Sequence, residues 1–204
     1  GTSTPVLQNE NTPCTLNLDE FPFVKAKLEA EALCFKAASE GASAIVVCPP
    51  ETFGANDNDL ITSRNLINWY KQSNVLVSWG GVCVGYVDDV AVGILAAALR
   101  GKPGNRYILG GENVTVRQIA ELMFDILGEK RNILEIPNPI IRLSTKIACA
   151  LNIPLPYNPE LVPYATRFWF MDNTKAVKEL GISFRSARET LIPTLTWLKE
   201  ADLI

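Results

Sequence analysis

The sequence contains no histidine among its 204 residues. Histidine is the usual general base beside a catalytic serine or cysteine, and it is the most frequent zinc ligand in proteins. Its absence argues against hydrolases built on a Ser-His or Cys-His pair and against zinc enzymes. We accordingly expect no metal site in this chain.

Positive charge is also scarce. The 19 Lys and Arg residues are outnumbered by 22 Asp and Glu residues, which gives a formal net charge of −3 and an isoelectric point near 5.1. No basic run interrupts this balance, so the overall field repels nucleic acid and anionic lipid, and no nucleic-acid partner is expected.

Long hydrophobic runs are missing as well. The longest apolar stretch, residues 90–99, is far shorter than the roughly 20 residues that span a bilayer, so no membrane span is expected. The first twenty residues are polar and carry no positive charge, which does not fit a secretory signal. We expect a protein that is not secreted.

The five cysteines form no Cys-x-x-Cys pair. Four of them lie in apolar surroundings along the sequence, which predicts small buried thiols in a reducing compartment such as the cytoplasm or the interior of an organelle; the five are Cys14, Cys34, Cys48, Cys83 and Cys149.

A glycine-rich phosphate-binding turn is the last notable absence. Neither Gly-x-Gly-x-x-Gly nor Gly-x-x-Gly-x-x-Gly occurs between an expected strand and an expected helix. Such a turn lets the backbone approach dinucleotide phosphates at a helix N-terminus.

What is present has the composition of a globular α/β protein, with 48% hydrophobic and 20% charged residues. Apolar periodicity predicts strands near 44–48, 75–79, 84–87 and 107–109, and helices near 24–38, 89–100, 115–127, 139–151, 173–180 and 188–200. Thr115 and Gln118 form an expected capping box, Gly128 an expected helix end, and the proline-rich residues 152–164 an expected irregular segment.

One helix start has a notable spacing. Phe23 and Lys27 stand four residues apart, so their side chains share one helix face. An aromatic residue and a lysine at this spacing match the pattern Tyr-x-x-x-Lys, except that phenylalanine replaces the tyrosine and its phenol group. A phenylalanine cannot exchange a proton. The alternative interpretation of Lys27 is a solvated lysine that pairs with Glu31.

Five segments in order resemble the extended short-chain dehydrogenase/reductase family. The similarity is to its NAD-dependent epimerase/dehydratase branch, which includes dihydroflavonol reductases and hopanoid-associated sugar-epimerase-like proteins. The segments cover essentially the whole chain and comprise residues 22–31, 46–57, 84–101, 105–123 and 172–200.

The resemblance implies that the chain is the C-terminal part of a Rossmann-type parallel sheet with a small, mostly helical C-terminal lobe. Residues 1–104 would form the second half of the NAD(P)-binding domain, without the glycine-rich βαβ unit, and residues 105–204 the substrate-side lobe. An N-terminal Rossmann half or another protein chain would then complete the sheet; a homodimer and a larger complex are both open alternatives.

The resemblance also assigns site residues. Lys27 would bind the nicotinamide ribose, Phe23 would occupy the position of the catalytic tyrosine, and Pro49 and Pro50 would lie beside the nicotinamide. The implied cofactor is NAD or NADP. Because the glycine-rich turn is lacking, binding by this chain alone is in question.

Other candidate residues have structural alternatives. Tyr86 could replace the missing phenol. Asp88 and Asp89 could act as paired carboxylates, although adjacent acids at a helix start favour capping. Tyr164 and residues 168–170 could line a pocket, with packing of the small lobe favoured, and Arg142 and Arg167 could bind phosphate or simply be solvated.

Three functions compete. The first is an NAD(P)-dependent oxidoreductase or epimerase acting on a nucleotide sugar or a related carbonyl compound. The second is a non-catalytic relative that serves as a structural or assembly subunit of a larger complex, in an organelle for example. The third is a regulator that binds the cofactor without turnover.

Overall fold

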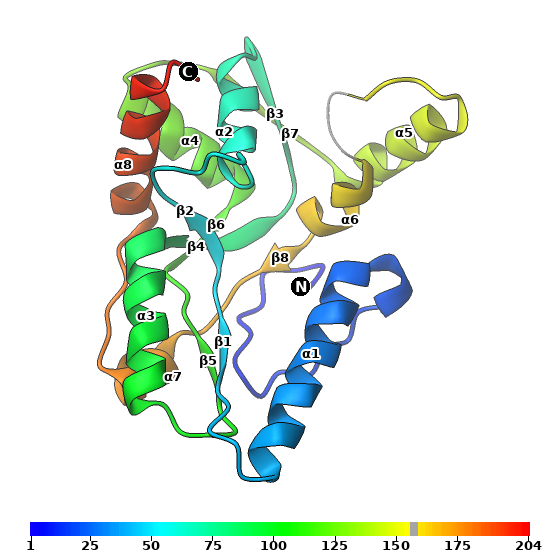
Figure 1. Ribbon diagram of the computed structural model, residues 1–204. Helices are drawn as coiled ribbons and strands as arrows, with labels where there is room; N and C mark the ends of the chain where they lie inside the picture. Colours follow the sequence, from blue (N-terminus) through cyan, green and yellow to red (C-terminus); the bar gives the residue numbers. More distant parts are fainter. Residues whose placement is uncertain (156–158) are drawn as a thin grey trace.

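The computed structural model describes residues 1–155 and 159–204 and confirms the α/β class (Figure 1). The helices are α1 (Pro22–Ser39), α2 (Ser63–Tyr70), α3 (Val87–Arg100), α4 (Val116–Leu127), α5 (Asn138–Ala150), α6 (Val162–Ala165), α7 (Thr174–Leu180) and α8 (Ala187–Glu200), with short 3-10 turns at Leu18–Glu20 and Pro159–Leu161. The strands are β1 (Val46–Cys48), β2 (Glu51–Phe53), β3 (Asn74–Ser78), β4 (Gly81–Tyr86), β5 (Arg106–Ile108), β6 (Glu112–Thr115), β7 (Asn132–Ile136) and β8 (Phe168–Trp169).

Strand pairing is mostly parallel, as expected for strands separated by helices. β1 pairs with β5, β3 pairs with β7, and β4 pairs with β2 and β8, all in parallel, while β6 runs antiparallel to β4. β1 and β5 lie between α1 and the pair α3 and α7, so helices cover both faces (Figure 1).

The two expected parts of the chain are interleaved in space. β5 and β6, from residues 105–204, pair with β1 and β4, from residues 1–104. Helix α7 likewise packs on α3. Because the two parts share strand pairs, residue 104 is not a boundary between two separately packed units. The roles of the two parts as cofactor side and substrate side stay a prediction.

Two hydrophobic clusters hold the fold together. The larger one joins α2, α4 and α8 to β3 and β4 and contains the fully buried side chains of Leu66, Val75, Met123, Leu191 and Leu198. The smaller one joins α3 and α7 to β5 through Tyr107, Leu109 and Leu180. Neither cluster includes a residue of α1, in which no residue is classed as buried.

Part of the local structure follows the sequence closely. Thr115 Oγ1 accepts a hydrogen bond from the backbone N–H of Gln118, whose side chain accepts in return from the backbone of Thr115, so the predicted capping box is confirmed. Gly128 ends α4 in the left-handed conformation at φ 72°, which glycine adopts without steric cost.

The proline-rich segment is irregular up to Leu155, and it is followed by the Pro159–Leu161 turn and by α6. Pro156, which belongs to this prediction, falls outside the described residues.

The prediction that four of the five cysteines are buried is wrong for at least two of them. Cys14, Cys34 and Cys149 are exposed, Cys48 is half-buried and only Cys83 is buried. Cys34 and Cys149 lie on α1 and α5, helices that bury few of their residues, so apolar neighbours in sequence did not become neighbours in a core. Burial raises the pKa of the Cys83 thiol to about 12 and that of Cys48 to about 11.

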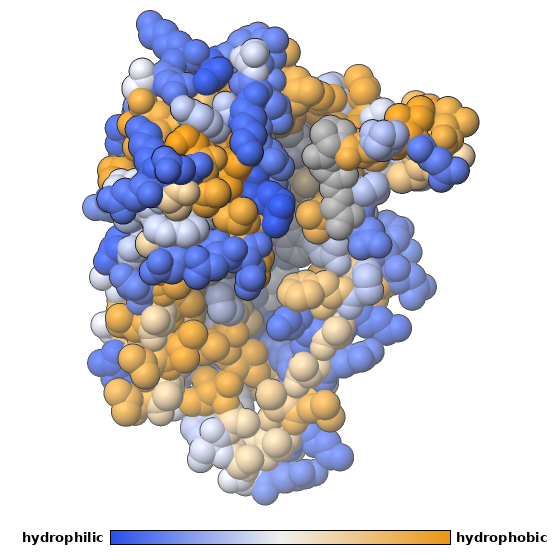
Figure 2. Space-filling model, turned by 45° about the horizontal axis from the view of Figure 1, so that its top comes forward, coloured by the Kyte–Doolittle hydropathy of each residue, from blue (hydrophilic) through white to orange (hydrophobic). Residues whose placement is uncertain are grey.

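Several large apolar side chains remain at the surface. Figure 2 shows them gathered over α3 and over α5. Among the described residues, none of the helices is both long and apolar enough to cross a bilayer. Within the same residues β1 pairs only with β5, so its second edge carries no strand.

Candidate functional site

The first turns of α1 carry the residues predicted to meet the cofactor. Pro22 lies in the first turn, where its missing N–H costs no helical hydrogen bond. Phe23 is 64% exposed, and the Lys27 ammonium lies 5.3 Å from the centre of its ring. The two side chains thus share a face of α1, as their spacing predicts.

The alternative interpretation of Lys27 as a partner of Glu31 is wrong. Glu31 pairs with Arg106 of β5, whose Nε lies 2.5 Å from the carboxylate oxygen. The Arg106 guanidinium also lies 5.7 Å from the ring of Phe35, one turn further along α1. Lys27 makes no ion pair with any residue in the described parts of the chain, so its charge is available at the surface.

The Pro49–Pro50 turn follows β1. Since β1 runs antiparallel to the preceding α1, the turn and the first residues of α1 lie at the same end of this layer (Figure 1). Pro50 packs against Gly85 of β4 so closely that a Cβ at residue 85 would lie 2.5 Å from the proline ring. Pro49 is exposed. The turn is therefore fixed on one side and open on the other.

Sequence reasoning missed a carboxylate at this turn. Glu51 begins β2 directly after the two prolines and is half-buried. Burial raises the pKa of its carboxyl group above the ordinary value of 4.5, because the ionised form is desolvated. The position next to a strand-terminating Pro-Pro pair was the only sequence feature that pointed to it.

A cavity of about 320 Å³ lies beside α1. Its walls come from the N-terminal loop, from α1 and from strands β5 and β8. The lining residues include Glu10, Cys14, Val24, Leu28, Arg106 and Trp169. Glu10 Oε1 accepts a hydrogen bond from the backbone N–H of Ile108 at 3.1 Å, which holds the loop on β5. Lys27, Pro49 and Pro50 are not among its lining residues.

The prediction that Asp88 or Asp89 is the N-cap residue of α3 is wrong. Tyr86 is the N-cap residue, and both aspartates lie within the first turn. Asp89 Oδ2 accepts a hydrogen bond from the backbone N–H of Arg185 at 2.9 Å, and the Arg185 guanidinium lies 4.1 Å from the Tyr86 ring. These contacts connect α3 to the segment before α8.

The aromatic residues of the C-terminal part pack against one another and against Phe21, and Trp169 also lines the cavity beside α1. Tyr164 stacks on Trp169 at 5.9 Å, and the fully buried Phe21 meets Tyr164 edge-on at 5.0 Å. Phe168 is also buried and contacts Phe170. Phe21 directly precedes α1, so this cluster fixes the position of the helix that carries Phe23 and Lys27.

The two arginines considered as phosphate ligands have protein partners. Arg142 donates to Thr166 Oγ1 from Nε at 3.0 Å and from Nη2 at 2.7 Å, and Arg167 lies over the Phe21 ring at 5.2 Å. Arg142 is exposed, as the solvated interpretation expects, and it also connects α5 to Thr166. Arg167 is half-buried, so that interpretation is wrong for it, and it connects the C-terminal part to the residue before α1.

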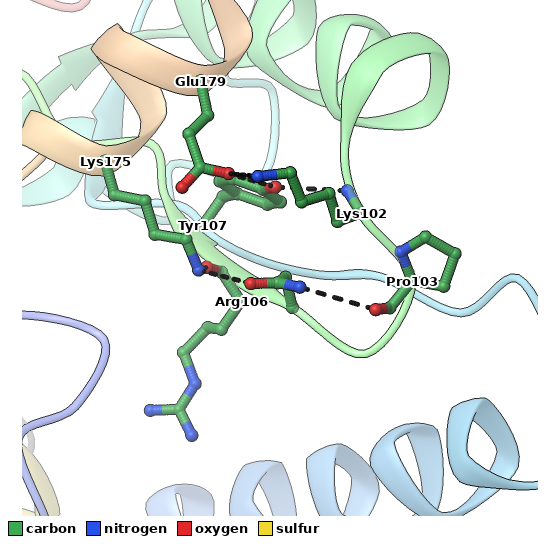
Figure 3. Close-up of polar contacts among 7 residues, drawn as sticks. Lys102, Pro103, Arg106, Tyr107, Lys175 and Glu179 are labelled. Atoms are coloured by element: carbon green, nitrogen blue, oxygen red, sulfur yellow. Dashed lines mark hydrogen bonds and ion pairs between the residues drawn. The ribbon is translucent and has the colours of Figure 1, made fainter.

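A polar network connects β5 to α7 (Figure 3). The buried Tyr107 hydroxyl donates to Glu179 at 3.0 Å and accepts from the backbone N–H of Lys102 at 3.2 Å. Lys175 donates to Asn105 Oδ1 and to the backbone oxygen of Arg106. The hydrogen bond from Tyr107 lowers the pKa of Glu179, and burial raises the pKa of Tyr107.

Groups able to hold a metal ion were also sought. In residues 1–155 and 159–204 no set of three or more Cys, Asp or Glu side chains converges in a way that could coordinate one.

No family model matches the chain. A protein of Synechocystis sp., provisionally named a dihydroflavonol 4-reductase, is 26% identical to it over 186 residues. The match covers 87% of this chain and 54% of the relative, so the chain spans about half the length of this curated protein.

Solved structures share the fold. A nucleoside-diphosphate-sugar epimerase from Pseudomonas aeruginosa superposes with a TM-score of 0.80 at 20% identity, covering 98% of this chain and 62% of that one. A dTDP-glucose 4,6-dehydratase from Streptomyces venezuelae, crystallised with NAD, gives 0.70 at 17% identity, with 98% and 56% covered.

These neighbours define the fold class of the chain as a Rossmann-type α/β protein. Together with the relative named a reductase, they confirm the resemblance to the extended short-chain dehydrogenase/reductase family, and the chain covers only part of the length of these proteins.

Proposed function

We propose that this chain is the C-terminal part of an NAD(P)-dependent oxidoreductase or epimerase that acts on a nucleotide sugar or a related carbonyl compound. The observation that carries the proposal is Lys27, an unpaired cation on the first turns of α1, at the end of the layer where the Pro49–Pro50 turn closes β1. An ammonium at this place suits the hydroxyls of a nicotinamide ribose.

In this proposal the residues have separate roles. Lys27 binds the ribose, and the backbone of the Pro49–Pro50 turn lies beside the nicotinamide ring. Residues 1–104 supply the cofactor side and residues 105–204 the substrate side. The dinucleotide phosphates are held by a glycine-rich unit that an N-terminal Rossmann half or a partner chain provides along the free edge of β1.

Proton transfer is the weak step of this site. Phe23 occupies the place of the phenol and offers no ionisable group. Tyr86, the alternative phenol, is not assigned this role in the proposal; the Arg185 guanidinium lies 4.1 Å from its ring and connects it to the segment before α8. Losing a general acid or base typically slows a reaction by about 10²–10⁴-fold. We therefore expect cofactor binding with little turnover.

The proposal is tested by titrating the protein, with its N-terminal Rossmann half present, with NADH and NADPH while following nicotinamide fluorescence. Lys27→Ala should weaken binding about tenfold or more, since it removes a charge-assisted hydrogen bond to the ribose. Lys25→Ala is the matched control, because Lys25 is an exposed lysine on the same helix. Equal affinities for the two variants would overturn the role of Lys27.

A second function is favoured by Phe23, which offers no ionisable group at the position of the phenol. Such a protein would keep the scaffold for its shape and act as a structural or assembly subunit of a larger complex. The same titration separates the two: well-folded protein that includes the N-terminal half and binds neither NADH nor NADPH would support the structural role.

A further inference from the structure

Helix α5 is an arm that extends away from the body of the molecule (Figure 1). Of its thirteen residues, only Thr145 and Ala148 are buried, on the side that packs near α6. Asn138 and Ile141 are half-buried, and the other nine residues of the helix are exposed. An arm of this kind needs an explanation, since a helix that buries so little gains little from packing.

The open side of α5 carries a continuous apolar stripe. Ile140, Leu143 and Ile147 are 58%, 61% and 49% exposed, and Leu151, directly after the helix, is 66% exposed. Their spacing of three and four residues places them on one face, about a quarter to a third of a turn away from the buried pair. Ile153 extends the apolar surface, and Figure 2 shows the hydrophobic residues gathered along this arm.

The charges of the arm all have one sign. Residues 137–155 contain Arg142 and Lys146 and no aspartate or glutamate, in a chain whose net charge is −3. Lys146 is exposed and lies about 100° around the helix from the centre of the stripe. From that flank its ammonium can reach an anionic surface on which the stripe rests. The overall negative charge acts weakly here, because salt screens charges beyond roughly 10 Å.

From these features we infer that α5 binds an anionic lipid surface, lying in the plane of the bilayer interface with its apolar stripe among the acyl chains. An amphipathic helix of this type needs an apolar face, a basic flank and no spanning length. A second copy of the chain fits less well, because a helix roughly 20 Å long and 10 Å wide offers far less area than the about 800 Å² per partner of a stable dimer.

The test is co-sedimentation of the 204-residue chain with phosphatidylcholine vesicles, with and without phosphatidylserine. The unmodified chain should bind the mixed vesicles and bind pure phosphatidylcholine more weakly. Lys146→Glu should weaken binding to the mixed vesicles about tenfold or more, since each basic residue near an anionic surface contributes on the order of 1 kcal/mol.

The apolar contribution is tested separately with Leu143→Ser and Ile147→Ser in one protein. Its matched control carries Leu95→Ser and Leu99→Ser, two residues of α3 that are 64% and 84% exposed. Circular dichroism checks the fold of each variant. The α5 variant should lose vesicle binding, and the α3 variant should keep it.

Three outcomes would overturn the inference. The first is an unmodified chain that binds neither kind of vesicle. The second is equal loss of binding in the α5 and α3 variants, which would mean non-specific adhesion. The third is an oligomer that the α5 variant dissociates while vesicle binding is absent, which would assign the stripe to a second copy of the chain.

Discussion

Among single residues, Phe23 has the largest consequence for proton transfer at the proposed site. Its ring has 64% of its surface exposed, so a hydroxyl group added to it meets solvent or ligand and not a packed core. The Lys27 ammonium, 5.3 Å from the ring centre, would favour the ionised form of a phenol placed there.

The first prediction follows from this geometry. Phe23→Tyr, made in the protein with its N-terminal Rossmann half, should restore proton transfer and raise dehydrogenase or epimerase turnover about 10²–10⁴-fold, measured as NADH formation or as epimerised product. Phe23→Leu is the control for a mere change of shape. A tyrosine variant no faster than the leucine variant would mean that more of the site than the phenol has been lost.

Glu51 carries a second prediction at this scale. Burial raises its pKa in the folded chain above 4.5, so the folded state holds this proton more tightly than the unfolded state does. The resulting stabilisation is complete below the unfolded pKa and is lost as the pH rises through the folded pKa.

Glu51→Gln should therefore raise the unfolding midpoint in urea at neutral pH, and the gain should vanish as the pH falls below 4.5. Glu29→Gln, at an exposed position on α1, controls for the change of net charge. A gain that is the same at both pH values would contradict desolvation as the cause.

At the scale of elements, helix ends were the most predictable feature. Thr115 with Gln118 and Gly128 mark both ends of α4 in the sequence, because capping depends on a few neighbouring residues. The same rule identifies Ser186 and Glu189 as the capping box of α8, a pattern that was present in the sequence but overlooked.

The α4 cap gives the third prediction. Thr115→Ala should lower the free energy of unfolding by about 1 kcal/mol, since it leaves an N–H of the first turn without its acceptor. Urea denaturation followed by circular dichroism measures it. Thr4→Ala, in the exposed N-terminal loop, should have an effect close to zero, and a loss as large as that of Thr115→Ala would argue against the cap as the cause.

Other elements could not be foreseen because distant parts of the chain decide them. β6 and β8 are short and form only by pairing with β4. Asp89 was expected to act on its own helix, yet it binds the backbone of Arg185, 96 residues further along. The exposure of Cys34 and Cys149 likewise depends on how far α1 and α5 stand from the core.

For the candidate site, the spacing of Phe23 and Lys27 and the Pro49–Pro50 turn were predictable because they are local motifs. The partners of Arg142 and Arg167 were not, because Thr166 and Phe21 reach them only through tertiary folding. The raised pKa of Glu51 is also a property of the folded surroundings and not of the sequence.

For the molecule as a whole, the free edge of β1 is the feature that most affects association with other chains. Among the described residues this strand pairs on one side only, and an unpaired edge offers N–H and C=O groups to any other strand. The helices on the two faces, α1 and α3, expose Leu33 and Leu99 at 69% and 84%.

The fourth prediction is that the 204-residue chain self-associates with rising concentration, as seen by sedimentation velocity. Addition of the N-terminal Rossmann half should suppress this association by covering the edge of β1. A chain that stays monomeric at all concentrations would show that the edge is protected in another way.

Strand β5 links the two faces of the molecule. Side chains alternate along a strand, and accordingly Arg106 reaches Glu31 of α1, whereas Tyr107 reaches Glu179 of α7 on the opposite face. Neighbouring residues of one short strand thus anchor two helices that do not touch each other. β5 therefore couples the positions of the two helices, because loss of either anchor would leave a polar side chain of this strand without its partner.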